Sequence, residues 1–188
     1  MMSLTQMRVP VPGLVVLILT AVVVMGSKFP QTGKSPTGKF IQISGQVSVN
    51  GTSAISGATV FSDSTITTAP RSSAVVSLGK LGRVEVLPSS TMRLIFGDAN
   101  VSVGMLDAGR VRVSSSSNVN ATVTTRDGQI TSTGNQRNDF IVDTSCGNTF
   151  VAVKKGTVEL RAGETVKQIA AGNQDTAGQA VPGCTPAG

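Results

Sequence analysis

The sequence contains no histidine, tryptophan or tyrosine, and only two of its 188 residues are cysteine. Without histidine, the Ser-His-Asp and Cys-His groups of nucleophilic catalysis are excluded. A zinc site of mixed ligands is excluded too, and two cysteines are too few for a thiolate site. Six phenylalanines offer little base stacking for a nucleic-acid binder. We therefore expect a protein that is not an enzyme, holds no metal ion or cofactor, and binds no nucleic acid.

Two short motifs that suggest catalysis occur in the wrong context. Ser77 and Lys80 have the Ser-x-x-Lys spacing of some acyl-transfer enzymes, but that motif works at a helix N-terminus and here follows a strand signal. Gly33-Lys34-Ser35 matches the end of a phosphate-binding loop, but lysine occupies position 28, where the first glycine belongs. The ten acidic residues are scattered without the spacing of a calcium loop.

The formal net charge of +6 is unevenly distributed. Arg8, Lys28, Lys34 and Lys39 precede position 40, and no acidic residue does. From position 40 onward, twelve basic residues stand against ten acidic ones. The basic patch that a nucleic-acid-binding domain would need on its folded body is not indicated. The pattern indicates instead a basic stem beside a membrane.

An apolar segment follows Arg8, and residues 14–25 read LVVLILTAVVVM. A charged start followed by such a run is the layout of a bacterial export signal. Residues 11–26 would span about 24 Å as a helix, short of the roughly 30 Å of a bilayer core. We assign residues 1–26 to a hydrophobic helix that is either a short uncleaved anchor or a cleaved signal. Because no Ala-x-Ala cleavage site is present, we favour the anchor. A buried globular helix is the remaining interpretation.

Two signals in the sequence disagree on the orientation of this segment in the membrane. The lysines that follow it would by themselves keep the C-terminal side in the cytoplasm. The two cysteines and the Ser-, Thr- and Asn-rich body favour an exported domain, and we give them more weight. The expected location is the periplasmic or extracellular side of a bacterial membrane, with the membrane contacted through residues 11–26.

Four times along the chain, a glycine precedes alternating aliphatic residues. The four units are GQVSV (45–49), GRVEV (82–86), GRVRV (109–113) and GTVEL (156–160). Each predicts a chain reversal followed by a strand with one apolar and one polar face. Their starts lie 37, 27 and 47 residues apart, which argues against a regular solenoid.

Short strand signals separated by turn residues continue between these units. Strands are expected at 40–44, 46–49, 58–62, 65–68, 74–78, 83–87, 92–96, 100–103, 109–114, 120–124, 129–132, 140–144, 150–154, 157–161 and 167–170. This predicts an all-β domain at 40–174, an irregular β-solenoid or sandwich of many short stacked strands, preceded by one N-terminal hydrophobic helix. Residues 27–39 are expected to be a linker and residues 175–188 a Gly/Pro-rich tail.

Cys146 and Cys184 are the only cysteines. A disulfide between them would close a loop of about 38 residues, stabilise the protein by roughly 4 kcal/mol in the chain-entropy model, and imply an oxidising compartment. It would also hold the tail against the strand near Phe150. The alternative is two unpaired thiols, one buried and one on a mobile tail; we favour the bridge.

Arg110 and Arg112 are expected on one face of their strand, with Arg83 in the equivalent place of another unit. If these strands are neighbours, they form a basic stripe able to contact an acidic partner or cell-wall polymer. The alternative is that outward arginines keep a sheet edge soluble.

The order of these motifs resembles the FecR protein domain over about residues 41–174. The matching segments are Gly45-x-Val47, 54–60 (AISGATV), 66–68 (ITT), 73–78 (SAVVSL), 84–94 (VEVLPSSTMRL), 106–113, 123–125, 130–134, 140–142, 151–158 and 171–174 (AGNQ). The resemblance implies an exported, FecR-like all-β module. In well-known members this module is the periplasmic half of a regulator whose cytoplasmic N-terminal segment holds a sigma factor and whose far end contacts an outer-membrane transporter.

The chain departs from that plan in two places. About ten residues precede the apolar run, too few for an anti-sigma domain, and 14 residues follow Gln174, too few for a C-terminal signalling module. We therefore expect a membrane-tethered, non-catalytic binding or scaffold module whose partner is a cell-envelope protein or polymer. The alternative is a reduced transmembrane signalling regulator related to FecR-type sigma-factor regulators.

Overall fold

The computed structural model describes residues 36–186, which form two large β-sheets. The predicted all-β class is confirmed, and the only helix in the described range is the 3₁₀ turn η1 (Gly79–Leu81). The N-terminal hydrophobic helix expected at 1–26 lies outside the described residues. Within residues 36–186, no helix is long and apolar enough to cross a bilayer.

Sheet A contains eight strands in the order β17-β14-β13-β10-β7-β6-β1-β4. Their bounds are β1 Thr37–Ser44, β4 Thr59–Phe61, β6 Ser73–Ser77, β7 Gly82–Val86, β10 Arg110–Ser115, β13 Asn138–Asp143, β14 Thr149–Lys155 and β17 Gln174–Ala177. All neighbouring strands in this sheet are antiparallel.

Sheet B contains nine strands in the order β16-β15-β12-β11-β9-β8-β5-β2-β3. Their bounds are β2 Val47–Val49, β3 Thr52–Ser53, β5 Ser64–Thr68, β8 Ser90–Gly97, β9 Asn100–Met105, β11 Asn120–Thr124, β12 Gln129–Ser132, β15 Thr157–Ala162 and β16 Thr165–Ala170. The pair β9–β11 is parallel and the other pairs are antiparallel.

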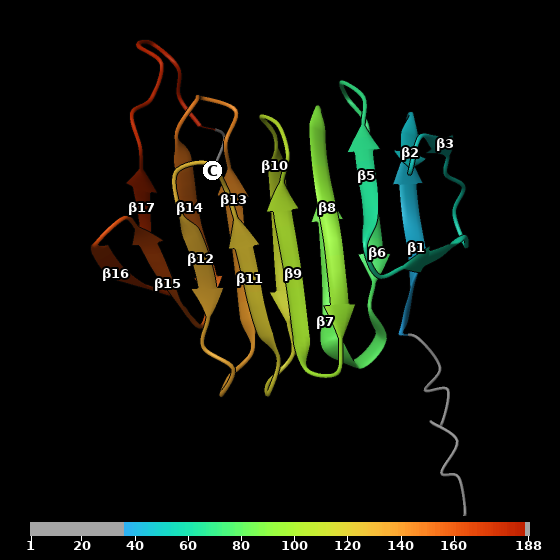
Figure 1. The fold of residues 1–188 in the computed structure, drawn as a ribbon, viewed down its shortest axis with the longest axis horizontal. Helices are drawn as coiled ribbons and strands as arrows, with labels where there is room; N and C mark the ends of the chain where they lie inside the picture. Colours follow the sequence, from blue (N-terminus) through green and yellow to red (C-terminus); the bar gives the residue numbers. More distant parts are fainter. Residues whose placement is uncertain (1–35, 187–188) are drawn as a thin grey trace, which may run out of the picture. The chain divides into compact units, whose positions relative to one another are not determined.

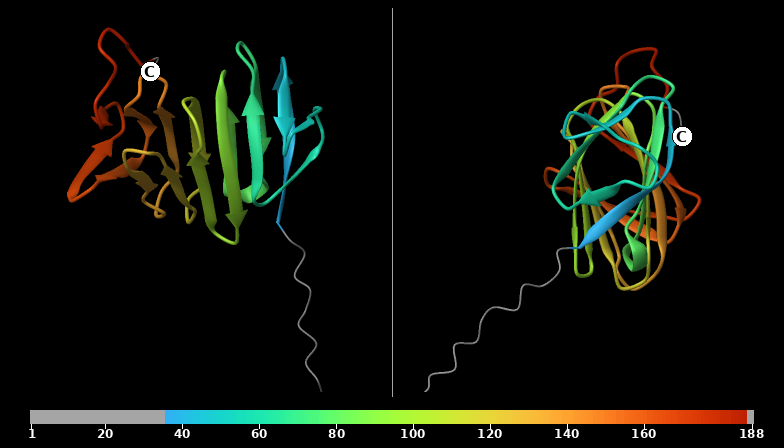
Figure 2. Two further views of the ribbon diagram at one scale, coloured as in Figure 1. Left: turned by 45° about the horizontal axis from the view of Figure 1, so that its top comes forward. Right: turned by 90° about the vertical axis from the view of Figure 1, so that its right-hand side faces the viewer.

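The chain crosses back and forth between the sheets while both advance in the same direction. Apart from β3 and β4 at one edge, strands follow each other in chain order across each sheet (Figure 1). Seen from the N-terminal end, the two sheets are the walls of a flattened stack (Figure 2). The structure is therefore a sandwich built by irregular solenoid-like stacking.

The core lies between the sheets and is almost entirely aliphatic. Alternate residues of each strand point inward, so Val84 and Val86 of β7 and Val111 and Val113 of β10 are all buried. The largest fully buried side chains include Phe40 and Phe140. Alternation of apolar and polar residues along each strand is sufficient to predict which residues enter this core, because each strand buries one face.

The glycines of the repeated units allow close approach between neighbouring strands. Gly82 has a φ of 126°, and a Cβ there would lie 2.1 Å from the carbonyl oxygen of Ser114. Gly156 has a φ of 82°, and a Cβ there would lie 2.1 Å from Oδ1 of Asn138. Both the backbone conformation and the space thus require glycine at these strand starts.

The expected strands are present, with bounds that differ by up to three residues. Two strands that the sequence did not indicate are β3 and β17. The ladder also runs beyond the range 40–174 at both ends, since β1 begins at Thr37 and β17 ends at Ala177. The short polar sequence of β17 (QDTA) carries no strand signal, and pairing with β14 alone defines it.

Candidate functional site

Three loops gather at one end of the strands in the C-terminal half of the stack. They are residues 106–109 between β9 and β10, 125–128 between β11 and β12, and 144–148 between β13 and β14. The first and third are joined because Thr144 N donates to Gly109 O at 2.8 Å, and Gly109 N donates to Thr144 Oγ1 at 3.1 Å. Stacking of the strands thus brings together loops whose bonded residues, Gly109 and Thr144, are 35 residues apart in sequence.

The C-terminal tail forms a fourth wall beside these loops. Cys146 and Cys184 are joined as a disulfide, with their Cα atoms 5.5 Å apart. Val181 N donates to Cys146 O at 2.8 Å, and Cys184 N donates to Val181 O at 3.1 Å. The bridge and these bonds place the Val181 side chain against the loops. A disulfide is typical of proteins in an oxidising compartment outside the cytoplasm.

The loops and the tail enclose a cavity of about 400 Å³. A second cavity of about 270 Å³ adjoins it and shares Ala108 and Ser145. We call the two together the loop-end groove. Its lining comprises 105–108, Arg126, Asp127, Thr144, Ser145, Gly147 and Val181, continued by Pro88, Ser89, Gly109, Arg110 and Asp143.

The loop-end groove combines exposed apolar side chains with fixed polar groups. Leu106 and Val181 are 54% and 57% exposed, respectively. Arg126 Nε donates to Asp127 Oδ1 at 3.1 Å, and the guanidinium also donates to the carbonyl of Gly147. Asp127 Oδ2 accepts a bond from Thr149 Oγ1 at 3.2 Å. An apolar rim beside an ion pair, in which Arg126 is 75% exposed and Asp127 is 16% exposed, suits noncovalent recognition of a partner.

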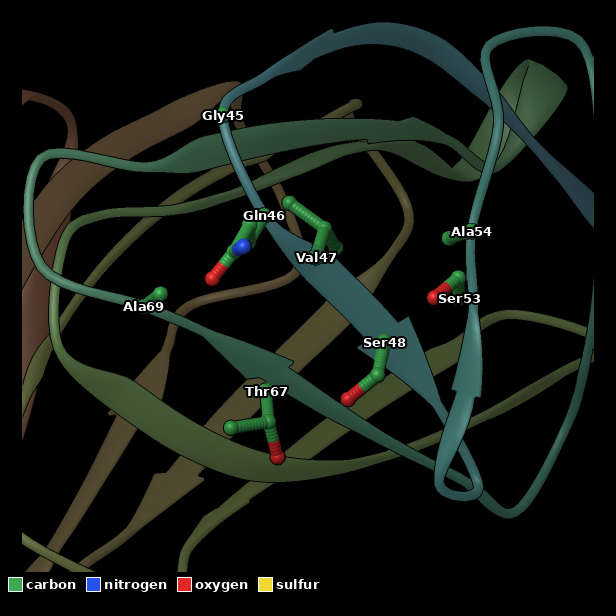
Figure 3. Close-up of a pocket in the computed structure, with 8 residues that line it drawn as sticks. All are labelled: Gly45, Gln46, Val47, Ser48, Ser53, Ala54, Thr67 and Ala69. Atoms are coloured by element: carbon green, nitrogen blue, oxygen red, sulfur yellow. The ribbon is translucent and has the colours of Figure 1, made fainter.

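A separate cavity of about 530 Å³ lies over β2, at the N-terminal end of the stack (Figure 3). Its polar side chains, Gln46, Ser48, Ser53 and Thr67, come from β2, β3, β5 and the β1–β2 turn. Its lining has no charged side chain and no large exposed apolar one. It offers fewer features for a specific partner than the loop-end groove.

The strands that carry the three arginines are neighbours, as the basic stripe requires, but acidic side chains lie among the arginines. Strands β7 and β10 are neighbours, yet Arg83 lies opposite Ser114 and Arg112 lies opposite Glu85. Arg112 donates two bonds to Asp139 on β13, at 2.8 and 2.6 Å. The arginines therefore alternate with carboxylates on this face of sheet A. The alternative, that they keep a sheet edge soluble, does not apply either, because β7 and β10 are interior strands of sheet A.

The Arg112–Asp139 pair is partly buried, with side chains 28% and 13% exposed. Burial raises the pKa of the Asp139 carboxyl. Hydrogen bonds from Arg112 and Ser114, with the charges of Arg112 and Lys154, oppose burial and hold this pKa below its ordinary value. The hydrogen bond to Asp139 likewise raises the pKa of Arg112. The pair is therefore charged at neutral pH and is structural in character.

Ser77 and Lys80 are not on a regular helix. Ser77 ends β6, its Oγ accepts a bond from Gly79 N at 3.4 Å, and Lys80 lies in η1. Among the described residues, no three acidic, cysteine or histidine side chains gather in a way that could hold a metal ion. Sequence reasoning assigned no site role to Leu106, Arg126 or Val181, and Leu106 entered it only as part of the segment 106–113 that resembles the FecR domain. The Arg126-Asp127-Gly128 turn was recognisable, but nothing in it indicated which other loops it would meet.

Of the comparisons with known proteins, only that with solved structures found a match. No protein-family model matches the chain, and no curated protein matches it. Two crystal structures, both of a "putative anti-sigma factor" from Parabacteroides distasonis ATCC 8503, resemble it with a TM-score of 0.52 and 20% sequence identity. The match covers 60% of this chain and 53% of the other, so this chain matches about half of the solved protein's length. At this identity the likeness shows a related fold.

Proposed function

We propose that residues 37–177 form the extracytoplasmic binding domain of a membrane-tethered cell-envelope protein, and that the domain acts without catalysis. The loop-end groove is the observation that carries the proposal. Its partner is a protein or polymer of the envelope, held by the apolar rim of Leu106 and Val181 and oriented by the Arg126–Asp127 ion pair.

The position of the groove supports this role. Strand β1 is antiparallel to β6, β6 to β7, and β7 to β10. The start of β1 at Thr37 therefore lies at the opposite strand end from the start of β10 at Arg110, where the groove is (Figure 1). The groove thus lies at the strand end opposite to the one where the chain enters β1.

The resemblance to the FecR domain over residues 41–174 supports an envelope role. The disulfide agrees with an exported location. Fusion of alkaline phosphatase after Lys39 tests the location: an active reporter is expected. An inactive fusion beside an active cytoplasmic reporter at the same position contradicts export.

Photocrosslinking tests the binding role. A benzophenone amino acid is placed at Leu106 or Val181 in the groove, and at Gln168 on β16 as an exposed control. We expect one discrete adduct in intact envelopes from the groove positions and none from Gln168. The adduct should weaken when Cys146 and Cys184 are both changed to serine, because the tail wall is then released. Identical adduct patterns at groove and control positions would refute the groove as the binding site.

A second candidate is a transmembrane signalling regulator, favoured by the fold shared with the solved protein described as a putative anti-sigma factor. The two proposals differ in what the N-terminal residues do. Co-purification of a sigma factor with the full chain, lost on deletion of residues 2–8, would favour the regulator. A chain that captures only envelope partners would favour the binding module.

A further inference from the structure

Three large apolar side chains are exposed at the N-terminal end of the stack. Ile41, Ile55 and Phe61 are 53%, 72% and 61% exposed. Phe61 ends β4, the edge strand of sheet A, and Ile41 sits where the register of β1 shifts by one residue. The three belong to adjacent segments, because Thr37 pairs with Phe61, and Gly57 N in the β3–β4 loop donates to Phe40 O at 2.8 Å.

A lysine accompanies these side chains. Lys39 pairs with Thr59 in the β1–β4 ladder. Its Cε lies 3.9 Å from the point where a Cβ on Gly57 would be, so the lysine side chain passes close to the β3–β4 loop. The nearest acidic residue in sequence, Asp63, is engaged by two hydrogen bonds from Arg93. We call Lys39, Ile41, Ile55 and Phe61 the apolar edge patch. Its charge is positive, and long lysine side chains commonly pair an apolar stem with a charged head at a lipid interface.

The patch lies where the chain leaves the domain. Thr37, the first residue of β1, is directly opposite Phe61 in register. Only ten residues, 27–36, separate it from the apolar segment at 11–26, a span of at most roughly 35 Å when fully extended. Lys28 and Lys34 lie in that interval, and residues 1–39 contain no acidic side chain. An anionic bilayer surface is complementary to this charge.

We propose that the apolar edge patch rests on the surface of an anionic phospholipid bilayer, with Ile55 and Phe61 inserted at the headgroup level. This inference rests on the proposed membrane tether, which keeps the patch close to lipid. Individually weak contacts are effective there, because tethering raises the local concentration of the bilayer. Contact at this end restrains the body on the membrane and sets the direction in which the loop-end groove opens.

The absence of tryptophan from the whole chain makes the test direct. Phe61→Trp and Ile55→Trp each introduce a single fluorophore into the patch, and Val166→Trp on β16 does so at the far end of sheet B, where Val166 is 45% exposed. The full-length variants are reconstituted into phosphatidylcholine vesicles containing phosphatidylglycerol, with and without brominated lipid chains. Unchanged far-UV circular dichroism shows that each variant is folded.

Brominated lipid is expected to reduce emission from positions 55 and 61 roughly twofold and to leave position 166 unchanged. Adding Lys39→Glu to Phe61→Trp, or omitting phosphatidylglycerol, should reduce the quenching. Flotation of the vesicles after carbonate extraction reports the tether separately. Protein that floats with unquenched patch positions overturns the docking and leaves the tether standing, whereas protein that does not float overturns both.

Two other occupants of the patch give different signals. If residues 11–26 of the same chain covered it, emission at position 61 would be blue-shifted but insensitive to brominated lipid and to dilution. If a second copy covered it, emission would change on dilution of the protein within the vesicles. Either result overturns the bilayer contact.

Discussion

The two ends of the stack are finished in different ways. At the C-terminal end, the six-residue edge strand β16 carries Lys167, whose Nζ donates to Asp175 of β17 at 2.8 Å and so joins sheet B to sheet A. The disulfide secures the tail nearby. At the N-terminal end the edge strands β3 and β4 have two and three residues, and apolar side chains remain exposed.

This difference shows two solutions to one problem. Every open sheet has edges that can pair with other chains, and proteins block them with charge, short strands or covering segments. At the C-terminal end, an ion pair links the edge strands of the two sheets and a disulfide holds the tail. The N-terminal end uses short strands, which prevent pairing with another strand but leave Ile55 and Phe61 available for a different surface.

Removing the disulfide should have the largest effect on this comparison. Cys146→Ser combined with Cys184→Ser is expected to lower the free energy of unfolding by about 4 kcal/mol, because the unfolded chain is no longer closed into a loop of 38 residues. Urea denaturation of the full chain measures this loss. Wild type treated with reductant is the matched control and should lose the same amount. A loss below about 1 kcal/mol would show that the tail does not stabilise the C-terminal end.

Truncating one isoleucine at each end should give unequal losses. Ile169 on β16 is 3% exposed and belongs to the core, whereas Ile55 is 72% exposed. Ile169→Ala is expected to cost about 2–3 kcal/mol of unfolding free energy, and Ile55→Ala less than about 0.5 kcal/mol. The substitutions are chemically identical, so each controls for the other. Equal losses of unfolding free energy in urea denaturation would contradict the view that the Ile55 side chain contributes little to the stability of the fold.

Two arginine–aspartate pairs extend the comparison to the two halves of the stack. Arg112 pairs with Asp139 in a partly buried site, while Arg93 and Asp63 are both more than half exposed. Arg112→Met is expected to lower the free energy of unfolding by about 1–2 kcal/mol, and Arg93→Met by a clearly smaller amount, because solvent screens the exposed pair. A larger loss of unfolding free energy for Arg93→Met than for Arg112→Met would show that the exposed pair, and not the partly buried one, stabilises the protein more.

The acid response of the Arg112–Asp139 pair follows from the lowered pKa of Asp139. Its stabilising contribution is present above the unfolded-state pKa of about 3.9 and is lost as the pH falls through the lower folded-state value. The difference in unfolding free energy between wild type and Arg112→Met should therefore shrink as the pH falls from 6 to below 3. A difference independent of pH would indicate that lost packing, and not charge, explains the variant.

The smallest effect is expected for Lys167→Ala. Both partners of the Lys167–Asp175 pair are partly exposed, at 45% and 32%, so the loss of unfolding free energy should stay below about 0.5 kcal/mol. Amide hydrogen exchange is the more sensitive measurement, and β16 and β17 should exchange faster in this variant. Lys155→Ala serves as a control at another exposed lysine. Unchanged amide exchange in β16 and β17 would show that the ion pair does not hold these two strands together.

Local sequence patterns predicted the strands well, because each strand buries one face and begins at a glycine or a turn. They could not assign strands to sheets. GQVSV and GTVEL enter sheet B while GRVEV and GRVRV enter sheet A, yet all four look alike. Alternation states which residues are buried, but the partner strand is decided by packing over long distances.

The candidate site was less predictable for the same reason. The arginine stripe was inferred from one face of two strands, but Asp139 enters that face from β13, whose place beside β10 no local pattern reveals. The loop-end groove depends on three loops and a tail that meet only after stacking. Two sequence signals pointed toward this end of the molecule: the pair Cys146 and Cys184, which holds the tail wall, and Arg110, which lines the groove.

The orderly advance of strands along both sheets has a consequence for how such a body can change in evolution. Each layer touches mainly the layers beside it, so a hairpin can be gained or lost without rebuilding the remainder. Length then becomes an adjustable property of the scaffold. The loops at one rim and the patch at one edge can diverge separately, since neither depends on how many layers lie between them.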